Sequence, residues 1–205
     1  MKILALAIFL NSIFYMPITA QERLPIIPPQ QYNEEQKLAA EEFLEARNVP
    51  VFGPFEPLMH SPNVMNQARS MGDYLRYKSA LGNTLSELVI LITAREWTQD
   101  YEWFVHYPIA LKAGIDADIA DAIAEGRRPT DMSDDQEIVY NFSMELHRNK
   151  RVSDQTYRRT QERFGNKGVV DLTGINAYYT LLAMQMNIAQ YQVPEDAQKL
   201  PRFPD

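Results

Sequence analysis

Apolar residues recur along the chain at the three- and four-residue spacing of amphipathic helices, and no segment shows the strict alternation typical of a half-buried strand. Predicted helices begin at capping residues and end at glycines or loop-like segments. The predicted starts are Asn33, Ser61, Thr84, Ser133 and Ser153, and the predicted stops include Leu81, Gly114, Gly126 and Gly165. This pattern predicts about seven or eight helices.

The run at residues 169–191 is apolar on all sides, which predicts a helix at the centre of the fold rather than on its surface. Residues 21–32 are rich in proline and are expected to form an extended arm, and residues 194–205 are expected to form a tail. We therefore predict an all-α, single-domain helical bundle that spans residues 33–193.

The first twenty residues differ from the rest of the chain of 205. A lysine, an apolar stretch and Ala20 predict a signal peptide at residues 1–20 and a periplasmic or secreted protein without stable membrane association after cleavage. The alternative, an uncleaved anchor, is disfavoured by Asn11 and Pro17 within the stretch. The net charge of −7 and the absence of a basic block argue against nucleic acid as a partner. The chain has no cysteine, which excludes thiol chemistry.

Glu87 shares a predicted helix face with Ile90, Leu91 and Ala94. A carboxyl group among apolar side chains is poorly solvated, which favours its neutral form and suits a general acid or base. The sequence Thr84-Leu85-Ser86-Glu87 is also a capping box, in which Glu87 would only bind the start of its own helix. Spacing alone leaves both interpretations open.

His106 follows Glu102 by four residues, so the two side chains can pair on one helix face. Such a pair would stabilise the imidazolium and orient the ring, although a buried histidine is more often a hydrogen-bonded core residue. The three histidines of the chain, at 60, 106 and 147, form no ligand motif, so we expect no metal site.

Arg95 lies near Trp97, Tyr101 and Trp103 at the expected bend between two helices. An arginine beside aromatic rings can hold a carboxylate through two hydrogen bonds, but a hydrophobic corner of the bundle would contain the same aromatic residues. His60 lies just before a predicted helix start, and a hydrogen bond to the loop backbone is the alternative to a role in binding.

Three segments together resemble the carboxymuconolactone decarboxylase family, which includes the alkylhydroperoxidase D-like proteins. The central one is ELVILITAREWTQDYEWFVHYPIALKAGI. The upstream one comprises GPFEPLMHSP and YLRYKSALGNTLSEL, and the closing one is RVSDQTYRRTQERFGNKGVVDLTGINAYYTLLAMQMNIAQYQVP. The resemblance runs from about Tyr32 to Pro194. It implies an alkylhydroperoxidase D-like bundle that assembles as a homo-oligomer, commonly a trimer or hexamer.

The peroxidase branch of this family has a glutamate, a Cys-x-x-Cys motif and a histidine. Glu87 and His106 match the first and last of these, but Gln99 and Glu102 stand at the positions of the two cysteines. Peroxide reduction in that branch requires both thiols, so thiol peroxidase activity is disfavoured.

The decarboxylase branch uses neither thiol nor cofactor, so the resemblance implies a lyase that acts on a small carboxylated lactone or cyclic acid. It implies His106 as the acid or base, Glu87 as the relay or orienting carboxylate, and Arg95 as the partner of the substrate carboxylate. The remaining candidates for substrate binding are Tyr101, His60, Glu102 and Trp103. A non-catalytic small-molecule-binding or scaffold protein of the same fold is the alternative.

Overall fold

The structure is a computed structural model that describes residues 23–203, and every regular element within this range is helical. The prediction of an all-α bundle with seven or eight helices is confirmed. The elements are η1 (Pro29–Gln31), α1 (Glu34–Arg47), α2 (Phe55–Leu58), α3 (Pro62–Tyr77), α4 (Gly82–Glu96), α5 (Asp100–Lys112), α6 (Ala117–Ala124), α7 (Asp134–Asn149) and α8 (Asp154–Ala189). The predicted signal peptide lies outside the described residues. Within residues 23–203, no helix combines the length and the apolarity that crossing a membrane requires.

Local capping chemistry sets several helix starts as the sequence predicts. Asn33 and Ser133 each form a reciprocal capping box with the glutamine three residues later. Gly165 interrupts α8 with a positive φ of 67°, a conformation that glycine adopts at little cost. The helix that begins at Asp154 therefore ends at Gly165 as predicted, and a second helix continues after the kink to Ala189 under the same label α8.

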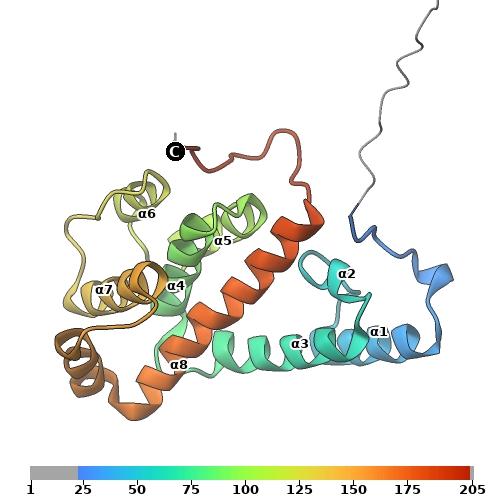
Figure 1. The fold of residues 1–205 in the computed structure, drawn as a ribbon, viewed down its shortest axis with the longest axis horizontal. Helices are drawn as coiled ribbons and strands as arrows, with labels where there is room; N and C mark the ends of the chain where they lie inside the picture. Colours follow the sequence, from blue (N-terminus) through green and yellow to red (C-terminus); the bar gives the residue numbers. More distant parts are fainter. Residues whose placement is uncertain (1–22, 204–205) are drawn as a thin grey trace, which may run out of the picture.

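Helix α4 forms the centre of the bundle. Every residue from Ser86 to Ala94 is buried, and α5, α7 and α8 all pack against this helix. Figure 1 shows α4 behind α8, with α5 above and α7 to one side. Buried residues in the expected central run of α8 include Leu172, Ile175, Leu182 and Met186.

Helix α8 also has an exposed apolar face in this single chain. This α8 stripe consists of Val170, Leu181, Met184 and Ile188, which are 39–69% exposed. The expectation that 169–191 is enclosed on all sides is therefore correct for only part of its circumference.

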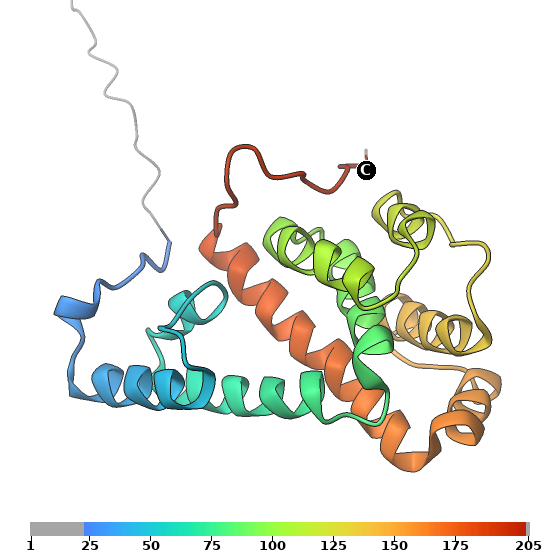
Figure 2. The same cartoon turned by 180° about the vertical axis from the view of Figure 1, so that it is seen from behind.

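Helices α1, α2 and α3 form a second group, in which α2 and α3 contact α8, as the rear view in Figure 2 shows. The crossing of α3 and α8 is close because Gly72 has no side chain. A Cβ atom at this position would collide with the hydroxyl of Tyr178. Glycine at 72 thus allows α3 to approach the face of α8 that carries Tyr178 and Tyr179.

The C-terminal segment folds back over the junction of α4 and α5. Leu200 is only 3% exposed, and its backbone N–H donates to Asp100 Oδ1 at 3.0 Å. Arg202 forms an ion pair with the same carboxylate, and Arg95 donates to the carbonyl of Pro201 at 2.7 Å. The expected tail is therefore attached to the bundle.

Candidate functional site

Glu87 and His106 meet in the interior of the bundle. His106 Nδ1 lies 2.7 Å from Glu87 Oε2, and the side chains are 5% and 0% exposed. The capping-box interpretation of Glu87 is wrong, because α4 begins two residues before Thr84 and has no side-chain cap. Thr84 instead donates to the carbonyl of Ala113 at 2.6 Å. The Glu87 carboxylate is thus available to the imidazole.

The turn between α4 and α5 brings Glu87 and His106 together. Thr98 adopts a positive φ of 47°, and the side chain of Gln99 then caps α5 by accepting from the N–H groups of Tyr101 and Glu102. The two helices consequently pack against each other, with the Glu87 face of α4 toward the His106 face of α5. The His106 ring is fixed further by an edge-to-face contact with Tyr179, at 5.3 Å between ring centroids.

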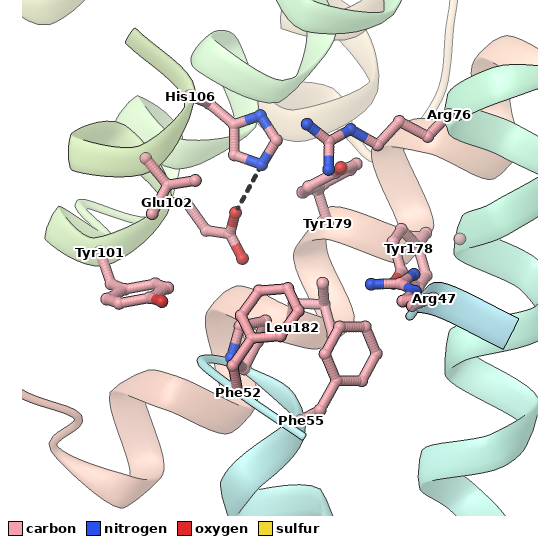
Figure 3. A pocket seen from close by; sticks show the side chains of 13 residues that line it. Arg47, Phe52, Phe55, Arg76, Tyr101, Glu102, His106, Tyr178, Tyr179 and Leu182 are labelled. Atoms are coloured by element: carbon pink, nitrogen blue, oxygen red, sulfur yellow. Dashed lines mark ion pairs between the residues drawn. The ribbon is translucent and has the colours of Figure 1, made fainter. Parts of the chain in front are cut away.

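A second carboxyl group faces the other nitrogen of the imidazole. Glu102 Oε2 lies 3.4 Å from His106 Nε2, an ion-pair distance that Figure 3 marks with a dashed line. Burial raises the pKa of Glu102, a direction opposed by His106 and Arg76 and reinforced by Glu87. A fraction of the Glu102 side chains therefore carries a proton at a pH where an exposed glutamate would be ionised.

Arg76 of α3 completes the charged cluster. One of its terminal nitrogens lies 3.5 Å from Glu87 Oε1. Burial alone would lower the pKa of Arg76, but facing Tyr179 and Glu87 more than offsets this, and the pKa is raised. The guanidinium thus stays cationic. Figure 3 shows it pointing toward His106 and Tyr179.

These side chains surround a cavity between α2, α3, α5 and α8. The cavity has a volume of about 50 Å³, and the empty space including the solvent at its open mouth is about 430 Å³. Phe52, Phe55 and Leu182 provide an apolar wall, whereas Arg47, Arg76, Glu102 and His106 provide charged groups. Glu87 does not line the cavity but lies directly behind His106. His106 thus lines the cavity with a carboxyl group near each ring nitrogen, and the carboxylate of Glu87 orients the imidazole as general acid-base catalysis requires.

The structure brings together some of the predicted site residues and separates others. Tyr101, Glu102 and His106 all line the cavity. Arg95 does not, because eight residues along a helix turn its side chain about 80° away from that of Glu87 and move it about 12 Å along the axis. Its guanidinium binds the C-terminal segment and stacks on Phe203 at 4.5 Å.

His60 and Trp103 are also outside the cavity. His60 is exposed, and its Nε2 lies 2.9 Å from the carbonyl of Pro25 in the N-terminal arm. Trp103 follows Glu102 directly, so it projects from a different face of α5 and packs against Tyr107, at 5.6 Å between ring centroids. Three residues that were predicted to bind substrate therefore make their contacts outside this cavity, namely Arg95, His60 and Trp103.

Sequence reasoning did not identify Arg47, Arg76, Tyr178 and Tyr179, which line the cavity. The adjacent tyrosines within the apolar run 169–191 were the one available signal, since a buried tyrosine hydroxyl usually needs a polar partner. Arg76 carries no local signal, because its position depends on how α3 crosses α8.

No group of three or more histidine, cysteine, aspartate or glutamate side chains among residues 23–203 is arranged to hold a metal ion. No protein-family model matches the chain, and a search of curated proteins found no significant match.

Proposed function

We propose that the chain is a cofactor-independent lyase of the carboxymuconolactone decarboxylase type, which acts on a small carboxylated lactone or cyclic acid. The single observation that carries the proposal is the buried Glu87–His106 pair at 2.7 Å, with the imidazole lining a cavity. The sequence resemblance, which implies His106 as the acid or base and Glu87 as the orienting carboxylate, also supports it.

The reaction follows from this arrangement. The bond between the substrate carbon and its carboxylate breaks, CO₂ leaves, and the electron pair stays on the conjugated ring as a dienolate. His106 then gives a proton to carbon, and the imidazole recovers one from solvent. Glu87 stabilises the imidazolium before the transfer and keeps the ring oriented. The apolar wall of Phe52, Phe55 and Leu182 limits water near the developing charge.

Release of CO₂ from carboxylated lactones by the purified protein tests the proposal. Replacement of His106 by alanine should lower the rate by about 10²- to 10⁴-fold, because general acid-base catalysis contributes on this scale. His147→Ala is the matched control, since His147 contacts Thr93 and does not line this cavity. Equal rates for wild type and His106→Ala would remove His106 from the mechanism.

A non-catalytic binding protein of the same fold is the second candidate. The small volume of the cavity, about 50 Å³, favours it, because a complete lactone acid would need the open mouth as well. Saturable binding of such acids without release of CO₂, in wild type and His106→Ala alike, would support this candidate over the lyase.

We also propose that the chain functions as a periplasmic or secreted homo-oligomer. The exposed α8 stripe supports assembly, because apolar side chains gathered on one helix face commonly mark a protein interface. Light scattering on the purified protein would give the number of copies, and a monomer at all concentrations would contradict this part of the proposal.

A further inference from the structure

The inner end of the cavity contains a guanidinium with unused hydrogen-bonding capacity. Arg76 approaches Glu87 through one terminal nitrogen at 3.5 Å, and its buried Nε has no hydrogen-bond partner within the described chain. A buried donor without a partner costs free energy, which an oxygen atom of a ligand would restore. Arg76 is therefore suited to bind an anion in the cavity.

The other arginine at the cavity is already engaged. Arg47 Nε donates to Asp73 Oδ1 at 3.0 Å, and its guanidinium lies over the ring of Phe55 at 4.6 Å from the centroid. A ligand would have to displace these contacts. The anion is therefore expected to bind Arg76 rather than Arg47.

The acceptor atoms near Arg76 limit the charge of this anion. Glu87 Oε1 and Glu102 Oε1 are both buried without hydrogen-bond partners in residues 23–203. Another ionised oxygen close to Glu102 would be repelled, whereas a protonated Glu102 would donate a hydrogen bond to it. Burial already raises the pKa of Glu102, so this proton is added at modest cost.

Three neighbouring groups act on the charge of Glu102, namely His106 on α5, Arg76 on α3 and Glu87 on α4. Tyr101 on α5 and Tyr178 and Tyr179 on α8 also face Glu102, and its charge helps to raise their pKa values. Burial raises the pKa of both Tyr178 and Tyr179 well above the ordinary value, so both remain neutral donors. Glu102 is thus the carboxyl of this group that both lines the cavity and has a raised pKa.

We infer that Arg76 and Glu102 form a subsite that binds a small monocarboxylate together with one proton, which resides on Glu102. The cavity of about 50 Å³ has room for roughly one or two water molecules at about 30 Å³ each, so the carboxylate binds inside and its short substituent extends into the open mouth. Two glutamates beside a single free guanidinium disfavour a dianion such as phosphate. The subsite deepens the proposed function by assigning the group that holds the substrate carboxylate.

Titration calorimetry of the full chain with propionate tests the subsite, with propionamide as the uncharged ligand of the same shape. Propionate should bind and propionamide should not. Measurements in two buffers with different ionisation heats should show uptake of one proton per propionate. Above the pKa of Glu102 in the free protein, the affinity should fall about tenfold per pH unit.

Two variants separate the roles of the side chains. Arg76→Met should weaken propionate binding about tenfold to hundredfold, the scale of a hydrogen bond to a charged group. Arg69→Met is the matched control, because Arg69 lies on the same helix and pairs with Asp73 without lining the cavity. Glu102→Gln should retain binding and lose its pH dependence.

Equal binding of propionate and propionamide, or no saturable binding of propionate, would overturn the inference. Binding without proton uptake would also overturn it, and this measurement needs no variant. Release of CO₂ from lactone acids without propionate binding would leave the proposed function standing and reject the subsite. Proton-linked binding without any release of CO₂ would support the subsite and contradict the proposed lyase function.

Discussion

Two histidines contact the central helix α4 from different sides, and their surroundings have opposite character. His106 meets Glu87 at 2.7 Å, faces Glu102 with its other nitrogen and borders a cavity. His147 of α7 lies 3.2 Å from the hydroxyl of Thr93. Burial lowers the pKa of His147, an effect that Glu96 only partly opposes. The same type of side chain, packed against the same helix α4, thus suits proton transfer in one place and neutral packing in the other, depending on its partners.

Replacing the α4 residue that contacts each histidine should give the largest difference in stability between the two environments. Glu87→Ala leaves Arg76 and His106 without their buried counter-ion, and breaking a buried pair in this way costs about 3–5 kcal/mol of stability. Thr93→Val removes only neutral hydrogen bonds, to His147 and to the carbonyl of Val89, and each such bond contributes about 0.5–1.5 kcal/mol. Urea unfolding measures both. Similar losses for the two variants would contradict the distinction between the two histidine environments.

The pH dependence of stability should change in Glu102→Gln. Because the pKa of Glu102 is raised in the folded state, the unfolded chain ionises first as pH rises above the ordinary value of 4.5. Stability is lost as the pH rises through the folded pKa. The glutamine variant lacks this loss, so its stability relative to wild type should increase with pH in unfolding experiments. Parallel curves for the two proteins would refute the raised pKa.

His147→Asn should produce a smaller effect of opposite sign. The pKa of His147 is lowered in the folded state, so the unfolded chain takes up its proton first as pH falls below the ordinary value of 6.5. The wild type therefore loses stability on the acid side, through the folded pKa, and the asparagine variant does not. The difference in unfolding free energy should grow as the pH falls, and a difference independent of pH would argue against a buried neutral ring.

The most local effect is expected for Glu87→Gln, which preserves shape and removes the charge. The Nδ1 proton of His106 should move upfield in the NMR spectrum, because a charge-assisted hydrogen bond becomes a neutral one. The ring signals of His147 should not change, since it contacts α4 through Thr93. An unchanged Nδ1 signal would mean that the pair does not form in solution.

Most of the fold was predictable because local chemistry determines it. The capping boxes at Asn33 and Ser133 and the break at Gly165 each depend on residues within four positions of one another. The end of α3 was less predictable. The pattern extends to Leu81, but the helix ends at Tyr77, where Asp171 of α8 accepts from the backbone N–H of Ala80. That contact joins residues 91 positions apart.

The candidate site was predictable only in part for the same reason. Glu87 and His106 stand out by their type on apolar helix faces and by the family resemblance. Arg95 is close to them in sequence but faces the C-terminal segment, whereas Arg76 reaches them because Gly72 permits a close crossing of α3 and α8. Which arginine faces the cavity depends on the angle between helices, and no short segment of sequence encodes that angle.

The attachment of Leu200 to Asp100 has a consequence for the order of folding events. The contact closes a loop of 100 residues, and such closures are entropically costly and are favoured only after shorter-range structure exists. Helices α4 and α5 are neighbours along the chain and can pack together early. The C-terminal segment should therefore dock late in folding. It then stabilises the helix pair that carries Glu87 and His106 after this pair has formed.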